Sequence, residues 1–192
     1  PMTLAAARGY TLLGARRAIL LLALLIPLVR FGPRYTMLAS DLFSGHESRW
    51  SDLSMSQDSE RVSQIILSLA HPGDTLLVWG YRPDIFAETR LPAGTRFLDS
   101  QPLTGVLADR HLTRSDVAAP ELAARDRREL NRTAPTFVVD GLGPYNPELA
   151  INRYPDLTGW LANYEIVAHT RHSVIFERVS GALKPASSAM RQ

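Results

Sequence analysis

An uninterrupted apolar run near the N-terminus constrains this chain more than any other feature. Ala18–Val29 reads AILLLALLIPLV and contains no charged or polar side chain. A soluble helix is usually apolar along one stripe, whereas this run is apolar all round. Arg16 and Arg17 precede it and Arg30 follows it, where long cationic side chains can reach the headgroups of a bilayer. The run therefore predicts a transmembrane helix.

Two alternatives to a membrane helix remain open. A bilayer span needs about 20 apolar residues, and a run of about 10–14 also suits a core helix or the apolar part of a signal peptide. A signal peptide needs small residues at a cleavage site soon after the run, but the sequence continues as RFGPRY from Arg30. Pro27 would kink or end the helix, which membrane helices tolerate.

The flanking charges and the composition indicate orientation and source. More arginines precede the run than follow it, which favours a cytoplasmic N-terminal side and places the rest of the chain in the periplasm or cell exterior. Lys184 is the only lysine among 21 Lys and Arg residues, as expected for a GC-rich bacterial genome. Cysteine is absent, which excludes disulfides, thiolate metal sites and cysteine nucleophiles. No basic run alternates with aromatics, so no nucleic-acid partner is expected.

Helical and strand patterns alternate after the apolar run. The segment 56–70 has apolar residues at i, i+3, i+4 and i+7, the pattern of an amphipathic helix. Short apolar runs predict buried strands at Thr75–Trp79, Thr95–Leu98 and Thr136–Val139. Further helices are predicted at Ile85–Arg90, Pro120–Arg132 and Leu157–Asn163, with a single turn at Pro147–Ala150. Tyr164–His169 and Ser173–Val179 predict a terminal β-hairpin.

This order of elements predicts an α/β fold, a three-layer sandwich with a mostly parallel central sheet and a C-terminal β-hairpin, preceded by one transmembrane helix. We expect residues 1–34 to hold the membrane helix and residues 35–55 to form a juxtamembrane linker. Residues 56–179 would form the extracytoplasmic α/β domain, followed by a disordered tail at 180–192. The segment 99–119 is long and irregular, which is uncommon in a compact domain unless the segment has a role.

Candidate ligand-binding residues follow the predicted strands, because open parallel sheets bind ligands at the carboxyl ends of their strands. The candidates are Trp79, Tyr81, Arg82, Asp140, Tyr145 and Asn146. Aromatic rings, one arginine and a carboxylate together suit a sugar or a phosphate. The alternative is structural: Gly and Pro shape the turns, the aromatics pack, and Arg82 pairs with Asp84 or Asp140.

Motifs for self-sufficient catalysis are absent from the sequence. The first predicted strand is followed by WGYRPD rather than a glycine-rich nucleotide fingerprint, and no P-loop occurs. The nucleophile elbow G-x-S-x-G and the zinc motif H-E-x-x-H are missing too. His169 and His172 flank the hairpin turn without a nearby carboxylate, so we expect solvated histidines rather than a metal site. No catalytic residue, metal or cofactor is expected in this chain.

Three stretches, taken together, resemble a known family. They are Gly73–Leu76 continuing through Val78–Pro83, Arg96–Leu98 with Ser100 and Gln101, and Phe137–Gly141 with Tyr154–Leu157. They resemble the C-terminal soluble region of bacterial multi-spanning glycosyltransferases of the dolichyl-phosphate-mannose–protein mannosyltransferase-like class. The resemblance covers roughly Leu20 to Val179.

The resemblance implies transfer of a sugar from a polyprenyl-phosphate donor to an acceptor at the outer membrane–water boundary. The family's catalytic acidic residues lie between early membrane helices, and no residue of this chain matches them. We therefore expect a non-catalytic extracytoplasmic domain that helps to hold the lipid-linked sugar or the acceptor. Its partners would be the bilayer and the rest of a multi-spanning transferase, and a start at Pro1 fits such a fragment. The rivals are a standalone single-pass binding or scaffold protein and a divergent α/β enzyme that uses the loops Trp79–Asp84 and Asp140–Asn146.

Overall fold

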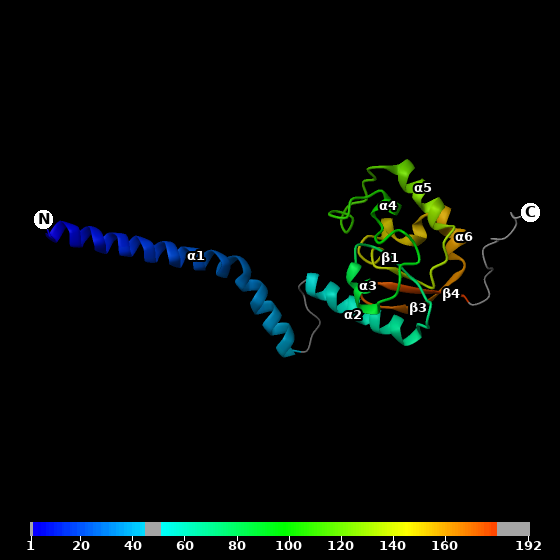
Figure 1. The fold of residues 1–192 in the computed structure, drawn as a ribbon, viewed down its shortest axis with the longest axis horizontal. Helices are drawn as coiled ribbons and strands as arrows, with labels where there is room; N and C mark the ends of the chain where they lie inside the picture. Colours follow the sequence, from blue (N-terminus) through cyan, green and yellow to red (C-terminus); the bar gives the residue numbers. More distant parts are fainter. Residues whose placement is uncertain (1, 45–50, 180–192) are drawn as a thin grey trace, which may run out of the picture. The chain divides into compact units, whose positions relative to one another are not determined.

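The computed structural model describes residues 2–44 and 51–179, and it divides the chain into two compact units that meet at Ser54 and Met55. The expected disordered tail at 180–192 lies outside the described residues, as does part of the expected linker at 45–50. The first unit is dominated by one long helix. The second unit is a mixed α/β domain (Figure 1).

Helix α1 (Met2–Ser44) is longer than the apolar run that predicts it. It continues through the first ten residues of the segment expected to be a linker. Within the described residues, one stretch is long and apolar enough to span a membrane, Leu21–Asp41, and none of its 18-residue apolar window is buried. Pro27 and Pro33 lie inside the helix, and Figure 1 shows α1 bending before its C-terminal end. Each proline removes a helical hydrogen bond and crowds the preceding turn, which accounts for the bend.

The α/β unit contains most of the predicted elements, with an additional short helix α4 and without the predicted strand at Thr95–Leu98. Its helices are α2 (Ser51–Leu69), α3 (Pro83–Thr89), α4 (Gln101–Thr104), α5 (Pro120–Leu130) and α6 (Thr158–Leu161), with 3-10 turns η1 (Pro147–Leu149), η2 (Ile151–Arg153) and η3 (Pro155–Leu157). Its strands are β1 (Leu76–Trp79), β2 (Phe137–Asp140), β3 (Tyr164–His169) and β4 (Val174–Arg178). The predicted terminal hairpin is confirmed as the antiparallel pair β3–β4.

The sheet is mixed rather than mostly parallel. Its strand order is β1-β2-β4-β3, and only β1 and β2 run parallel to each other. The other two pairings of the sheet, β4 with β2 and β4 with β3, are antiparallel. The expectation of a mostly parallel sheet is therefore not met, because the hairpin adds directly to the edge of the short parallel pair.

The predicted strand at Thr95–Leu98 does not form. The Thr95 hydroxyl accepts the backbone N–H of Phe97 at 3.0 Å, so this donor is used locally and not in a strand ladder. Such side-chain-to-backbone bonds compete with sheet pairing. β1 instead makes a single parallel bridge between Leu76 and Ala93. The apolar run alone was a misleading signal here.

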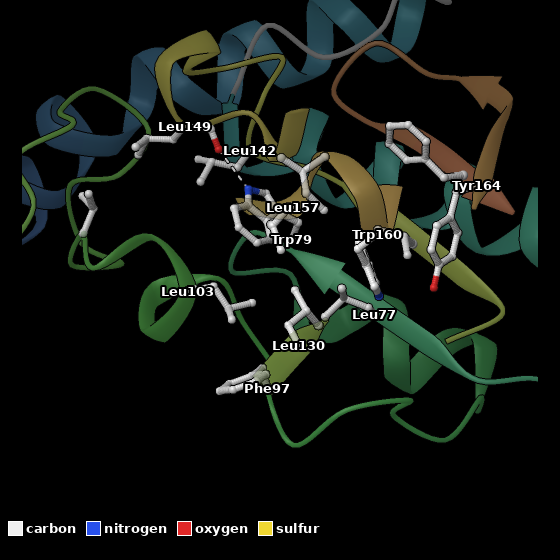
Figure 2. Packing of buried hydrophobic residues seen from close by; sticks show 14 residues of the cluster. Leu77, Trp79, Phe97, Leu103, Leu130, Leu142, Leu149, Leu157, Trp160 and Tyr164 are labelled. Carbon is white, nitrogen blue, oxygen red and sulfur yellow. Dashed lines mark hydrogen bonds between the residues drawn. The ribbon is translucent and has the colours of Figure 1, made fainter. Parts of the chain in front are cut away.

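Alternating side chains give the sheet two buried faces. One face packs against α2 and α3 through Leu76, Val78, Phe137, Val139, Ile175, Val62, Ile66 and Ile85. The other packs against α4, α5, α6 and the 3-10 turns, through residues that include Leu77, Trp79, Val138, Leu103, Leu130, Leu157 and Trp160 (Figure 2). Helices therefore cover both faces, and every residue of β1 and β2 is buried.

Neighbouring residues on α2 provide a matched test of this packing. Ile66 is fully buried, whereas Leu67 is 51% exposed. We expect Ile66→Ala to lower the free energy of unfolding by about 2–5 kcal/mol, because it leaves a cavity against the sheet. Leu67→Ala should change it by less than about 0.5 kcal/mol. Urea unfolding of the detergent-solubilised chain, followed by tryptophan fluorescence, measures both. Equal effects would contradict this placement of α2.

Candidate functional site

The candidate site lies at one edge of the sheet, where three segments meet. β1 ends at Trp79 and β2 ends at Asp140, and these two residues are parallel neighbours. β4 begins at Val174, which pairs with Asp140 in the antiparallel ladder. The loops after β1 and β2 and the turn before β4 are therefore brought together, as expected for the carboxyl ends of parallel strands.

Arg82 is the centre of this edge and is only 3% exposed. Its Nη1 and Nη2 atoms each lie 3.3 Å from Oδ2 of Asp58 on α2. Its Nε donates to the Ser59 hydroxyl at 3.0 Å, Nη2 donates to the Met55 carbonyl at 2.9 Å, and Nη1 donates to the Ser173 hydroxyl at 3.2 Å. The prediction that Arg82 pairs with Asp84 or Asp140 is wrong, because its guanidinium bonds residues of α2 instead.

Asp58 accepts hydrogen bonds from the hairpin turn as well as from Arg82. Its Oδ2 accepts the Ser173 hydroxyl at 2.8 Å, and its Oδ1 accepts the backbone N–H of His172 at 3.1 Å. Burial favours the neutral carboxyl, but hydrogen bonds from Thr170, Ser173 and His172 and the charge of Arg82 outweigh it and hold the pKa of Asp58 below its ordinary value. Asp58 is therefore an ionised, buried partner that links α2 to the edge.

Two glycines lie beside this network. A Cβ atom on Gly141 would lie 3.4 Å from Nη1 of Arg82 and 3.8 Å from the Ser173 hydroxyl. Gly80 has a φ of 142°, a conformation that favours glycine, and its Cβ position would lie 3.4 Å from the Gly141 backbone. The backbone conformation therefore favours glycine at Gly80, whereas a Cβ at Gly141 would make ordinary van der Waals contacts beside the guanidinium.

Asp140 stabilises the loop that follows β2. Its Oδ1 accepts the N–H groups of Leu142 at 3.0 Å and Gly143 at 2.7 Å, and its Oδ2 accepts the N–H of Ile151 at 3.0 Å. Burial raises the pKa of Asp140 above its ordinary value, although these three donors act in the opposite direction. All three of these hydrogen bonds come from backbone N–H groups, so the Asp140 carboxylate acts as a turn-forming group.

Two further candidates also have structural contacts. Trp79 is fully buried in the core, where its indole N–H donates to the Leu149 carbonyl at 2.9 Å (Figure 2). The Asn146 amide donates to the carbonyls of His111 at 2.9 Å and Arg114 at 3.2 Å. Trp79 therefore anchors the 3-10 turns, and Asn146 anchors the irregular segment between α4 and α5.

Tyr81 and Tyr145 are the candidates that the edge leaves accessible. Tyr81 is 59% exposed, and Tyr145 is half-buried. The Tyr145 ring stacks on the His172 imidazole, with centroids 4.7 Å apart and planes 12° from parallel. Burial raises the pKa of Tyr145, and the charges of Arg82, Asp58 and Arg171 also act on it. This aromatic pair therefore lies beside the buried Arg82–Asp58 network, and His172 is a packed residue rather than the solvated one expected.

A shallow depression lies next to the edge on the side of the 3-10 turns. It has a volume of about 270 Å³ and is lined by Gly143, Pro147, Ala150, Asn152 and Arg153. Sequence patterns did not indicate it, because η1 and η2 bring its residues together only in the folded chain. Among the described residues, no group of three or more His, Asp or Glu side chains is arranged to hold a metal ion.

Comparison with known protein families, curated proteins and solved structures finds no match to this chain.

Loss of the Arg82 guanidinium provides a direct test of the buried network. We expect Arg82→Met to lower the free energy of unfolding by about 3–5 kcal/mol, because it leaves the Asp58 carboxylate buried without its cation. Arg128→Met is the matched control, since Arg128 is exposed on α5 and surface changes cost less than about 0.5 kcal/mol. Urea unfolding measures both variants. A loss for Arg82→Met no greater than that for Arg128→Met would show that the buried pair has no stabilising role.

Proposed function

We propose that this chain is a membrane-anchored, extracytoplasmic and non-catalytic domain of a bacterial membrane glycosyltransferase that uses a polyprenyl-phosphate sugar donor. The observation that carries the proposal is the combination of a long exposed apolar helix with an α/β unit whose strand-end charges are bonded internally. The sequence resemblance to the C-terminal region of such transferases supplies the reaction class.

The bonding at the edge supports a positioning role over a catalytic one. A general acid, base or nucleophile must reach the reacting atoms, but Arg82 and Asp140 are buried and their hydrogen bonds are directed into the protein. Of the predicted candidates, the accessible ones are the aromatic Tyr81 and Tyr145, and the His172 ring stacks on Tyr145. Aromatic faces suit the apolar faces of sugar rings, so the edge would hold a lipid-linked sugar or an acceptor for chemistry carried out elsewhere.

Helix α1 supports the membrane part of the proposal. Its side chains between Leu21 and Val29 that the structure describes are exposed, including leucines and isoleucine that water would not favour. A bilayer provides the apolar environment that this surface needs. The excess of arginines before the run then places the α/β unit in the periplasm or at the cell exterior.

A standalone single-pass binding or scaffold protein is the second candidate. The observation in its favour is that, within the part of the chain that the structure describes, the hydrogen-bond partners of Arg82 and Asp140 belong to the α/β unit itself, between Met55 and Ser173. The edge can therefore form without a further polypeptide. The mass of the native product separates the two candidates.

The native mass is measured by capturing the protein from source-cell membranes with an antibody against residues 56–179. We expect a band that stays in the membrane fraction after an alkaline carbonate wash and is several-fold heavier than 21.3 kDa, because a transferase needs further membrane helices for catalysis. A carbonate-resistant band near 21.3 kDa would contradict the transferase proposal and favour the standalone protein. A band released by the wash would contradict membrane anchoring in both.

A further inference from the structure

The irregular segment between α4 and α5 is tied to the edge by one side chain. The Asn146 amide bonds the carbonyls of His111 and Arg114 and lies 3.1 Å from the Ser115 hydroxyl. At the base of the segment, the N–H of Ala118 donates to the Gly105 carbonyl at 2.8 Å. We call residues 105–119 the α4–α5 loop. Its attachment point, Asn146, directly follows Tyr145 of the aromatic pair.

His111 is the buried polar side chain of this loop. It is 4% exposed, and its Nδ1 atom is buried without a hydrogen-bond partner. A neutral imidazole can leave one ring nitrogen as an unused acceptor, but an imidazolium carries a proton on both nitrogens. Protonation would therefore place a charged donor in a buried position that offers it no acceptor, which is a costly arrangement.

The charged groups around the imidazole do not remove this cost. Burial lowers the pKa of His111 below its ordinary value of 6.5, while the carboxylates of Asp99 and Asp109 act in the opposite direction. Asp99 lies in the segment before α4, and Asp109 lies in the loop itself, where Arg110 pairs with it at 3.4 Å. From the loop after β2, the residue that contacts this part of the chain is the neutral Asn146.

We propose that His111 is an acid-sensitive latch, so that its protonation opens the α4–α5 loop and releases Asn146 from the strand-end edge. The closed loop accommodates only the neutral imidazole, and the open loop exposes the ring to water, where either form is stable. Opening would remove three contacts from Asn146 and free the residue next to Tyr145. The latch would make the accessible part of the edge sensitive to external acidity, independently of the proposed reaction class.

The direction of the effect follows from proton linkage. The open loop binds a proton more tightly than the closed loop, because the closed pKa is the lower one. Closure is therefore at its full stability above pH 6.5 and weakens as the pH falls from 6.5 towards the lower pKa of the closed form, below which it weakens no further. One linked proton allows the opening equilibrium to rise by up to about tenfold for each pH unit within that window.

Hydrogen exchange of the whole detergent-solubilised chain between pH 8 and pH 5 tests the latch, with rates corrected for intrinsic exchange. The control variant is His71→Gln, since the His71 side chain is 84% exposed. We expect peptides from residues 105–119 to lose protection on acidification in the wild type and in His71→Gln, by at most about tenfold for each pH unit below 6.5. In His111→Gln their protection should not depend on pH, because glutamine cannot take up the proton.

Two results would overturn the latch. One is pH-independent protection of the loop in the wild type, and the other is an equal pH dependence in His111→Gln. If the α4–α5 loop of His111→Gln stays open at every pH, an NMR titration of the wild-type His111 imidazole tests the latch instead. A midpoint below 6.5, accompanied by exchange broadening or shifts of the loop amides, supports the latch; a midpoint at or above 6.5 contradicts it.

Discussion

The buried ion pair between Arg82 and Asp58 is the interaction on which the arrangement of this edge depends. It joins α2 to the loop after β1, and through Ser173 and His172 it also reaches the turn of the terminal hairpin. These segments are far apart in the sequence, and a single guanidinium satisfies polar groups from all of them. Because a buried ion pair is stable only when its hydrogen bonds are complete, the pair fixes where each segment must lie.

The charged side chains at this edge therefore serve to fix the positions of neighbouring segments. Arg82 and Asp140 sit where open α/β sheets usually present binding groups, yet each is saturated by contacts within the protein. What they hold in place is the aromatic pair of Tyr145 and His172 and the loop attached to Asn146. In our proposal the aromatic groups recognise the ligand, the α4–α5 loop adjusts their surroundings, and α1, which is long and apolar enough to span a membrane, is the anchor.

Local patterns predicted much of the fold. Short apolar runs predicted strands at Thr75–Trp79 and Thr136–Val139, which are present at Leu76–Trp79 and Phe137–Asp140. The predicted helix at Pro120–Arg132 and the terminal hairpin are present too. Thr95–Leu98 was mistaken for a strand because a local hydroxyl bond competes with pairing, and apolar content does not reveal such a bond. The mixed sheet was missed because the hairpin's position next to β2 is a long-range choice.

The position of the candidate residues at one edge of the sheet was predictable from the sequence, but their hydrogen-bond partners were not. Strand ends located Arg82 and Asp140 correctly at one edge, whereas the partner of Arg82 lies 24 residues earlier on α2, where the periodic pattern shows only the polar face of a helix. The indole N–H of Trp79 bonds the Leu149 carbonyl, which lies 70 residues later in the chain, so local patterns could not reveal this contact. His111 gave no signal beyond its occurrence in an irregular segment, because its burial depends on contacts that Asn146 makes in the folded state.

A double-mutant cycle between Asp58 and Arg82 tests the central claim most directly. The free energy of unfolding is measured for the wild type, Asp58→Asn, Arg82→Met and the double variant. If the buried pair organises the edge, the double variant should be more stable than the sum of the single losses predicts, by about 1–3 kcal/mol, because it removes both charges rather than stranding one. Single losses that add to within about 0.5 kcal/mol would show that the two side chains act independently and would contradict the account.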